Sequence, residues 1–326
     1  MVTAAKRVPR GVERMPRAFG QVLSERKLWR VLPTPRFARP DGPPRIALSF
    51  DLDYQADTDV LGPLCDLLSE REILATMFSI GALVERDPAL YRAAAERGHE
   101  IANHTQTHPD NPVLNPDNEF WDLDAAAMRK EIGRAQDVLE QETGQRPTGF
   151  RAPHFKDAPP LRDALAAFPE ITYVTSSLAT RCPRPVPFFP GRDEDRGRMM
   201  LNFPATERAS GDPLMIPLTA CPGVRWSPFS SYLSIRRPAN PPMGAGLHDV
   251  PTFRRLWADM LRRDRGLGFV SVYFDPLDVM RDDETRTAFA AMLDHALSEG
   301  WAIGTLKDME RAWRPIAEGE YAGGAL

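Results

Sequence analysis

Apolar runs and amphipathic stretches alternate along the first half of the chain. Residues 45–50 and 73–80 are short, mostly apolar runs that predict buried strands, and residues 99–102 form a third. The stretches between them, residues 59–70 and 87–97, carry apolar side chains at helical spacing. This order of strand, helix, strand, helix and strand predicts a parallel sheet or an α/β barrel.

The second half of the chain repeats this alternation less regularly. A long helix is predicted at residues 123–142, and a last helix at 284–299 is followed by a closing strand at 301–305. Further strands are expected to end at Arg151 and to cover residues 173–175, 214–218 and 268–274.

Length and proline content divide the chain into regions. A chain of 326 residues, 42% of them hydrophobic, can bury one large core, and a single α/β barrel needs about 200 to 250 residues. Many of the 32 prolines gather between residues 153 and 242, which predicts an irregular insertion at 183–246. We expect a distorted barrel of seven or eight β/α units at 45–313, after a basic extension at 1–44 and before a tail at 314–326.

The charge is unevenly distributed. Residues 1–45 hold 11 Lys and Arg against 3 Asp and Glu, and the remainder holds 30 against 42. The apolar positions of residues 11–32 predict a basic helix, followed by a proline-rich linker; the helix either packs against the barrel or lies on an anionic membrane surface. We expect no nucleic-acid partner, because the basic segment lacks regularly spaced aromatic residues and the rest is acidic.

The sequence also bears on the cellular compartment. It has no run of 18 apolar residues, and its amino-terminal segment has no continuous apolar stretch like that of a secretory signal. The three cysteines lie far apart without a C-x-x-C pair, which is typical of unpaired thiols in a reducing compartment. We expect a cytoplasmic protein, with any membrane contact at the inner face, and the oligomeric state stays open.

Four polar residues follow the predicted strands. His104 and His108 are four residues apart, and on a helix-like turn both imidazoles can reach one metal ion. Asp51 and Asp53, at the end of the first strand, project to the same side of it. Because the carboxyl ends of parallel strands meet at one edge of a barrel, one of these two carboxylates can complete the ligand set. One Asp and two His leave positions open on a zinc-like ion, which is typical of a catalytic site.

Three blocks of sequence resemble the polysaccharide deacetylase family, of the NodB-homology or carbohydrate esterase type. They are the Asp-x-Asp pair in residues 49–53, the His-x3-His pair in residues 98–108, and the Arg-x-Pro motif in residues 149–154. The resemblance is specific over roughly residues 45–155. The Asp-x-Asp form is similar to the branch that includes some peptidoglycan deacetylases and allantoinase-like cyclic amidohydrolases. The resemblance implies a distorted barrel that hydrolyses an amide with a metal ion.

The resemblance also implies a role for individual residues. With the metal on Asp53 and the two histidines, Asp51 would take a proton from water as the general base. The main-chain N–H of His154 would complete an oxyanion hole. Arg151 would pair with Asp51 and hold it ionised and correctly aimed.

This chain differs from the family pattern at the residue that protonates the leaving amine. Most members carry a late histidine, whereas the matching stretch of this chain, residues 273–276, carries Asp275. An ordinary aspartic acid is a poor acid at pH 7, so Asp275 could serve only if burial raises its pKa strongly. The alternatives are His248, in the proline-rich region, and Asp51 returning the proton it took.

These observations predict a metal-dependent hydrolase that removes an N-acetyl group from an amino sugar. The expected substrate is a glycan precursor, a lipid- or nucleotide-linked sugar, or a polysaccharide. Two alternatives stay open: an allantoinase-like hydrolase of cyclic amides or imides, and a catalytically impaired barrel that only binds sugar. Zinc is the expected metal, although Asp-His-His ligands also suit cobalt, nickel, iron and manganese.

Overall fold

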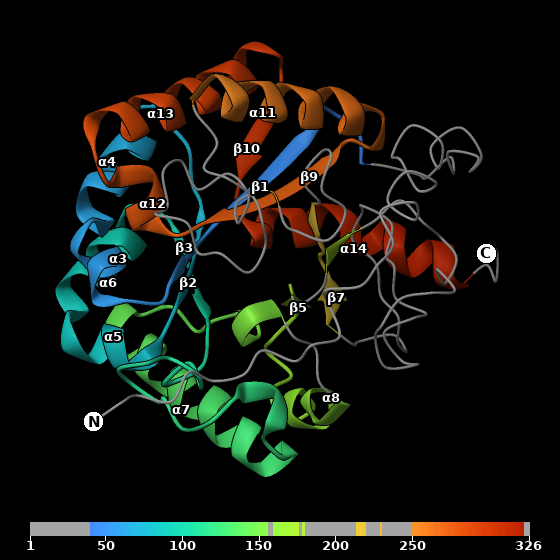
Figure 1. Ribbon diagram of the computed structural model, residues 1–326. Coiled ribbons are helices and arrows are strands. Elements are labelled where there is room, and N and C mark those ends of the chain that lie inside the picture. Colours follow the sequence, from blue (N-terminus) through green and yellow to red (C-terminus); the bar gives the residue numbers. More distant parts are fainter. Residues whose placement is uncertain are drawn as a thin grey trace, which may run out of the picture. The chain divides into compact units, whose positions relative to one another are not determined.

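The computed structural model describes residues 40–155, 159–175, 178–179, 213–219, 229 and 250–322. The chain divides into two compact units, Met1–Phe37 and Ala38–Leu326, and every described residue belongs to the second. Within this unit the strands form a curled sheet with helices along its outside (Figure 1). The expected basic helix at 11–32 and most of the 183–246 insertion lie outside the described residues.

Every strand pair that the structure describes is parallel. The main sheet runs in the order β7, β5, β4, β3, β2, β1, and both β9 and β10 also pair with β1. Its strands are β1 Arg45–Leu52, β2 Thr76–Ser79, β3 Glu100–Asn103, β4 Gly149–Phe150, β5 Tyr173–Val174, β7 Leu214–Met215, β9 Phe269–Phe274 and β10 Ala302–Gly304.

Strand β1 pairs with three other strands. Its first residues, 45–47, pair with β9 and β10 at the same positions, so these two strands occupy opposite edges of β1. Ser49 and Phe50 pair with both β9 and β2. Strands β10 and β2 therefore lie end to end along one edge of β1, while β9 occupies the other.

A short segment connects the two ends of the curled sheet. Strand β7 pairs with β5 at one end. Shortly after it, Thr219 of β8 (Leu218–Thr219) accepts a 2.9 Å hydrogen bond from the main-chain N–H of Ser271 in β9. Strand β8 itself pairs with β6 (Leu178–Ala179). The described strands thus confirm the predicted α/β barrel of distorted type.

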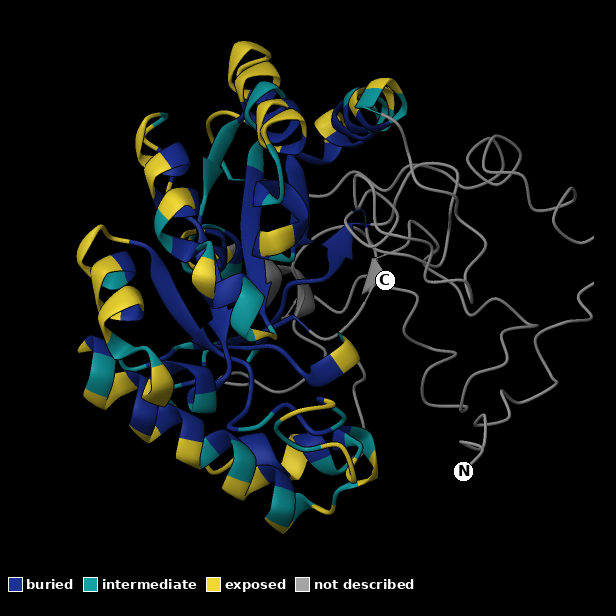
Figure 2. Cartoon of the chain, turned by 60° about the vertical axis from the view of Figure 1, so that its left-hand side comes forward, coloured by how far each residue is buried: buried dark blue, intermediate teal, exposed yellow. Residues whose placement is uncertain are grey.

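The helices of this unit bury one face and expose the other, while most of the strands are buried and β10 is of intermediate exposure (Figure 2). Helix α4 shows the reason, because Leu61, Leu64 and Leu68 recur at helical spacing and are all buried. The described α-helices are α3 Gln55–Asp59, α4 Leu61–Ser69, α5 Gly81–Arg86, α6 Pro88–Glu96, α7 Ala125–Thr143, α8 Pro159–Leu165, α11 Val250–Asp264, α12 Pro276–Met280, α13 Asp283–Ser298 and α14 Leu306–Ala322.

Alternate residues of β1 point to opposite sides of the strand. Phe50 is fully buried, and its ring centroid lies 6.1 Å from that of Phe289 in α13 and 6.3 Å from that of Phe274 in β9. Burying an aromatic side chain of this kind stabilises the fold by about 1.5–3 kcal/mol. Ser49 and Asp51, on the opposite side of the strand, are left for the interior of the barrel.

A buried carboxylate, Glu100, joins the amino ends of β2, β3 and β5. It accepts hydrogen bonds from the hydroxyl of Thr76 (2.7 Å), the phenol of Tyr173 (2.8 Å) and the main-chain N–H of Lys307 (3.0 Å). Thr76 Oγ1 also accepts a 2.8 Å hydrogen bond from the main-chain N–H of Leu306. The first turn of α14 therefore docks on these side chains, and we call Glu100, Thr76 and Tyr173 the basal cluster.

Two expectations need correction. The chain after Trp313 is not a loose tail as far as Ala322, because α14 continues through these residues with Pro315 inside it. The helix is held in place by Trp313, which is buried against Phe269 at a ring-centroid distance of 5.9 Å. The single strand expected at 214–218 is two short strands, since Pro217 has no N–H to continue the first one.

Among the described helices, none combines the length and the apolar character that a membrane crossing requires. Cys65 is buried and free, whereas Cys182 and Cys221 lie outside the described residues.

Candidate metal and catalytic site

Three side chains with metal-binding atoms meet at the carboxyl ends of β1 and β3. Asp53 directly follows β1, and His104 directly follows β3. Oδ1 of Asp53 lies 3.2 Å from Nε2 of His104 and 3.9 Å from Nε2 of His108. One ligand atom from each of the three residues lies within 4.8 Å of the other two. A single cation can therefore contact all three side chains.

The turn between the two histidines is not the helix-like turn that the spacing predicts. Thr105 and His108 have φ values of 70° and 49°, in the left-handed region. The main-chain N–H of His108 donates a 3.0 Å hydrogen bond to the Thr105 hydroxyl. A side-chain acceptor thus replaces the main-chain acceptor of a helix, and it brings the rings of His104 and His108 to a centroid distance of 4.9 Å.

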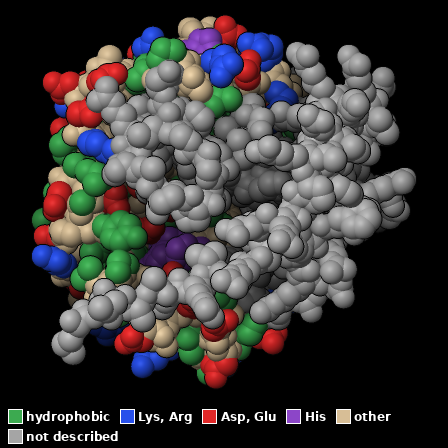
Figure 3. All heavy atoms as spheres, in the orientation of Figure 1, with side chains coloured by type: hydrophobic (Ala, Val, Ile, Leu, Met, Phe, Trp, Pro, Cys, Tyr) green, Lys and Arg blue, Asp and Glu red, His purple; other side chains and the backbone are tan. Residues whose placement is uncertain are grey.

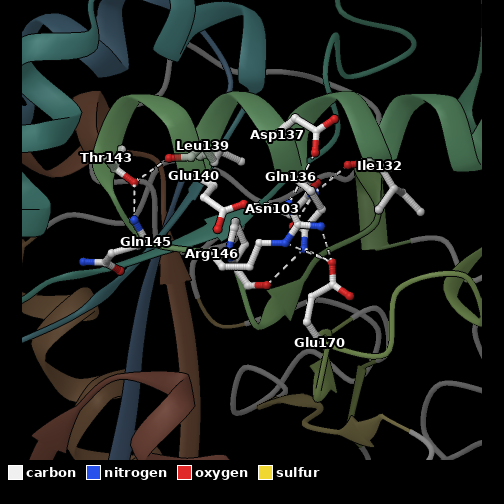
Figure 4. Close-up of polar contacts among 11 residues, drawn as sticks. Asn103, Ile132, Gln136, Asp137, Leu139, Glu140, Thr143, Gln145, Arg146 and Glu170 are labelled. Carbon is white, nitrogen blue, oxygen red and sulfur yellow. Dashed lines mark hydrogen bonds and ion pairs between the residues drawn. The ribbon is translucent and has the colours of Figure 1, made fainter.

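Asn103 anchors the start of this turn to α7 (Figure 4). Its Oδ1 accepts a 2.8 Å hydrogen bond from the main-chain N–H of Thr105. Its Nδ2 donates to the carbonyl of Ile132 (3.0 Å) and to Oε1 of Gln136 (2.9 Å). Asn103, directly before His104, is therefore held in place by buried hydrogen bonds to α7.

The His104 ring has a defined orientation. Its Nδ1 lies 2.8 Å from the carbonyl oxygen of Arg151, which can only accept, so Nδ1 carries the proton. In the neutral ring, Nε2 is then an acceptor that faces the carboxylate of Asp53. Oδ1 of Asp53 is buried and receives no hydrogen bond from the described residues. Two acceptors that face each other in this way fit a site for a cation.

The charges of the three side chains agree with this fit. Burial by itself would raise the pKa of Asp53. The opposing effect of His108 and His104 is larger, so the pKa is lowered overall and the carboxyl stays ionised. Burial lowers the pKa of His108 to about 4 and keeps its imidazole neutral. Burial also lowers the pKa of His104, yet Asp53 and Asp51 raise it by more. Positive charge is thus favoured beside Nε2 of His104, and an ionised Asp and a neutral His are the forms that bind metal.

Asp51 and Arg151 meet inside the barrel. Nη1 of Arg151 donates to Oδ1 of Asp51, and both side chains are buried. The other guanidinium nitrogens donate to the hydroxyls of Ser49 (2.9 Å) and Thr175 (3.1 Å). Burial raises the pKa of Asp51, and the nearby guanidinium only partly opposes this shift. The structure therefore brings the two residues together, and the net effect of the surroundings favours the protonated form of Asp51 more than the sequence indicates.

Aromatic rings surround the guanidinium of Arg151. Its Cζ lies 3.9 Å from the ring centroid of Phe78, 5.3 Å from that of Phe155 and 5.4 Å from that of Tyr273. Such rings attract a cation through their faces and exclude water from it. The Asp51–Arg151 pair is consequently held in an environment of low polarity.

Asp53 is held on both sides by residues that sequence reasoning missed. Asn111 donates from Nδ2 to the main-chain oxygen of Asp53 (2.7 Å). Asp57 accepts from the main-chain N–H groups of Tyr54 and Leu277, both at 3.1 Å. Burial raises the pKa of Asp57 to about 7. One carboxylate therefore joins the turn after Asp53 to the start of α12, and no motif marks it in the sequence.

The side chain of His154 also belongs to the site, although only its main-chain N–H was assigned a role. Its ring centroid lies 5.4 Å from that of His108, and its Nε2 lies 3.1 Å from Oδ2 of Asp110. On the other side, its ring lies 5.5 Å from that of Trp121. Asp110 and Trp121 lie in a loop whose course the sequence does not show.

Backbone strain is concentrated around these side chains. Positive φ values occur at Thr105, His108, Asp110, His154 and Phe155, none of which is glycine. Residues in this conformation cost about 1–3 kcal/mol each and cluster at functional sites.

The two remaining candidates differ in what the structure shows. Asp275 directly follows Phe274, which pairs with Phe50, so its backbone lies beside the carboxyl end of β1. It is the N-cap of α12, but its side chain makes no capping hydrogen bond. His248 lies outside the described residues.

Part of the chain matches a known sequence family. Residues 38–168 match the family model for polysaccharide deacetylase. Over 70 residues the chain is 43% identical to a chitooligosaccharide deacetylase from Sinorhizobium fredii, and this match covers 21% of the chain and 31% of that relative. The chain thus spans about a third of the length of the curated relatives it matches.

Solved structures share the fold. A Mycobacterium smegmatis protein of polysaccharide deacetylase type aligns with a TM-score of 0.66 and 20% identity, over 87% of this chain and 95% of that one. An allantoinase aligns with a TM-score of 0.62 and 17% identity, over 87% and 94%. Both confirm the distorted barrel, and at these identities the likeness concerns the fold alone.

Proposed function

We propose, from the match of residues 38–168 to the polysaccharide deacetylase family model, that the protein is a metal-dependent hydrolase that removes an N-acetyl group from an amino sugar. The observation that carries the proposal is the convergence of Asp53, His104 and His108, whose ligand atoms lie within 4.8 Å of one another. Beside them, Arg151 aims the buried side chain of Asp51, and the positive charge of a bound cation would favour the carboxylate form that can take a proton.

Asp53, His104 and His108 would hold a divalent cation, with zinc as the first choice because of its preference for this donor set. Bound there, the cation would supply Lewis acidity that lowers the pKa of water and polarises an amide carbonyl.

The protein's own residues would then carry the protons. Asp51 accepts a proton from the attacking water as the new C–O bond forms, and Arg151 keeps its carboxylate aimed. The main-chain N–H of His154 donates to the carbonyl oxygen while negative charge develops on it. When the C–N bond breaks, the departing nitrogen needs a proton, and Asp51 can return the one it took. Asp275, at the same edge of the barrel, is the second candidate for this step.

The direct test is release of free acetate from N-acetylglucosamine and its β-1,4-linked oligomers, with the full chain supplied with zinc. We expect turnover that is abolished by a chelator and restored by the metal. Asp51→Asn is expected to lower kcat roughly a thousandfold, which is the scale of losing a proton-transfer group. Unchanged turnover in both Asp51→Asn and His104→Ala would contradict the proposal.

The alternatives have distinct signatures in the same assay. Ring opening of allantoin without acetate release would indicate the cyclic amidohydrolase function. Tight zinc binding without turnover of any acetylated sugar or cyclic amide would indicate an impaired barrel.

A further inference from the structure

Helix α12 begins at the carboxyl end of β9 without a cap from its own N-cap residue. That residue is Asp275. An aspartate in this position normally accepts a hydrogen bond from the main-chain N–H of the second or third helical residue. In α12 these residues are Leu277 and Asp278, and the Asp275 side chain makes no capping hydrogen bond. The carboxylate of Asp275 therefore does not do what its place in the helix predicts.

The N–H groups of this first turn have other acceptors. Oδ1 of Asp57 accepts from the main-chain N–H of Leu277 at 3.1 Å. The main-chain oxygen of Asp275 accepts from the N–H of Asp278 at 3.0 Å. The first helical residue, Pro276, has no N–H. Asp57 thus caps α12 in place of Asp275.

Asp57 can cap a distant helix because its own position is fixed. It is 2% exposed, and its Oδ2 accepts a 3.1 Å hydrogen bond from the main-chain N–H of Tyr54, the residue after Asp53. Its helix, α3, lies beside α12 (Figure 1). One buried carboxylate therefore sets the turn after a candidate metal ligand and the start of α12 together.

Strand alternation determines the side to which Asp275 points. Tyr273 pairs in register with Ser49, and both face Arg151 inside the barrel. The ring centroid of Tyr273 lies 5.4 Å from Cζ of Arg151, and the Ser49 hydroxyl accepts from Arg151 at 2.9 Å. Phe274 points the other way and packs against α13. Asp275 keeps an extended backbone, with φ −81° and ψ 131°, so its side chain projects towards the interior again.

This direction brings Asp275 next to Asp51. The two residues directly follow the Phe274–Phe50 pair on neighbouring strands, and neighbouring strands lie about 4.8 Å apart. This end of the barrel is reached from the surface, because the side chain of His154 is 47% exposed. In the space-filling view, histidine side chains are visible within a hollow of the described part (Figure 3). A substrate amide at the candidate metal site would therefore meet both carboxyl groups.

We propose that Asp57 is a positioning residue: by capping α12 in place of Asp275, it leaves the Asp275 side chain directed at the reacting amide, where it protonates the leaving amine. This role rests on the proposed function. When the C–N bond breaks, its electron pair stays on nitrogen, and the proton of the Asp275 carboxyl moves to that nitrogen. Asp275 then regains a proton from solvent, and Asp51 releases to solvent the proton that it took from water.

The test compares two substrates that differ in their leaving group. N-acetylglucosamine releases an amine that must be protonated, whereas 4-nitrophenyl acetate releases a phenolate that needs no proton. With zinc-supplied full-length protein, the ratio of kcat/KM for the amide to kcat/KM for the ester isolates the protonation step. We expect Asp275→Asn to lower this ratio roughly a hundredfold. Asp57→Ala should lower it roughly tenfold, because Asp275 then turns to cap Leu277.

Two further variants sharpen the comparison. Asp57→Asn keeps one acceptor oxygen and should recover part of the loss. Asp59→Ala is the matched control, because Asp59 is an exposed carboxylate of the same helix that accepts a hydrogen bond from Gln55. It should leave the ratio unchanged.

The double variant Asp57→Ala/Asp275→Asn should have the same ratio as Asp275→Asn alone, because both changes act on one step. Additive losses in the double variant would overturn the proposal. An equal loss on amide and ester in Asp57→Ala would also overturn it, since Asp57 would then support only the fold or the turn after Asp53.

A crystal structure of Asp57→Ala provides a readout that does not depend on activity. We expect the Asp275 carboxylate to lie within hydrogen-bond distance of the main-chain N–H of Leu277. If the carboxylate stays where it is, Asp57 does not direct it, and the inference fails even though the enzyme releases acetate. If Asp275 turns but the wild type releases acetate from no acetylated sugar, the positioning by Asp57 stands and the proposed function fails.

Discussion

The two ends of the barrel differ in how their buried carboxyl groups are hydrogen-bonded. At the amino ends of the strands, Glu100 accepts three hydrogen bonds, from Thr76, Tyr173 and the backbone of Lys307. At the carboxyl ends, Oδ1 of Asp53 receives none from the described residues and faces the acceptor nitrogen of His104. Glu100 therefore has its hydrogen-bond partners within the protein, while the carboxylate of Asp53 lacks a positively charged partner at Oδ1.

Backbone conformation follows the same division. We call the candidate ligands Asp53, His104 and His108 the metal-ligand set, and positive φ values recur in two loops around it, including those of His108 and His154. The residues of the basal cluster lie at the starts of regular strands and have no such values. The difference indicates that the residues at the amino ends of the strands stabilise the fold. The carboxyl ends hold strained backbone and unpaired polar atoms, which is typical of a ligand-binding site. The four predictions below test this contrast.

The largest effect is expected at the metal-ligand set. In His108→Asn, zinc affinity should fall more than about a hundredfold and acetate release roughly a thousandfold, because one of three ligands is lost. Nδ1 of His108 makes no hydrogen bond to the described residues. The unfolding free energy of the metal-free variant should therefore lie within about 1 kcal/mol of that of the metal-free wild type. Calorimetry with zinc and urea unfolding with a chelator measure the two quantities. Large destabilisation of the metal-free variant would show that His108 also stabilises the fold, and it would contradict the contrast between the two ends of the barrel.

Arg151 is the exception at this end, because it is fully paired. Replacing it with methionine leaves Asp51 buried without its cation and removes the donors to Ser49 and Thr175. We expect the metal-free protein to lose about 3–5 kcal/mol of unfolding free energy. Urea denaturation at neutral pH measures this loss. Stability equal to that of His108→Asn would show that the guanidinium supports only the reaction.

His99 provides a pH test at the other end. Its Nδ1 accepts a 3.2 Å hydrogen bond from the main-chain N–H of Ala75, and burial lowers its pKa to about 4. The unfolded chain binds this proton near pH 6.5, so folding opposes protonation, and the contribution of His99 to stability falls as the pH drops from about 6.5 to about 4. His99→Asn keeps an acceptor without titrating.

Relative to this variant, the wild type should lose on the order of 3 kcal/mol over that range. Urea unfolding at several pH values, with chelator present, provides the measurement. His295→Asn, at an exposed position of α13, is the control for removing a histidine. Parallel pH curves for the wild type and His99→Asn would refute the assignment.

The smallest effect is expected in the basal cluster. Tyr173→Phe removes one of three donors to Glu100 and should cost about 1–3 kcal/mol of unfolding free energy, the usual cost of a buried acceptor that loses a partner. Zinc affinity and kcat should remain unchanged, because the cluster lies at the opposite ends of the strands. A loss of zinc binding in this variant would show that the two ends are coupled.

Much of the fold could be predicted, because its central strands are apolar runs. The expected strand at 268–274 and helix at 123–142 correspond closely to β9 and α7. Helix α11 was missed, although Phe253, Trp257, Met260 and Leu261 form a buried stripe at helical spacing. The pairing of β1 with three strands could not be predicted, because register depends on contacts between distant segments.

The approach of Asp53, His104 and His108 to one another could be predicted, because it follows from two strand ends and a four-residue interval. The loop residues Asp110, Asn111 and Trp121 were missed, because their positions depend on left-handed backbone angles and side-chain hydrogen bonds rather than on a periodic pattern. Asp57 was missed for a related reason, since its partner Leu277 lies far away in the sequence.

The three partners of β1 also constrain how the chain folds during synthesis. Strand β1, the first of the described strands to leave the ribosome, must wait for β9 on one edge and for β10 on part of the other. Until the last αβ unit has been made, an apolar strand carries open edges that can pair with other chains. Nascent chains cut short before Ala302 should therefore aggregate or recruit chaperones, and refolding should be slow, as is usual for folds dominated by distant pairings.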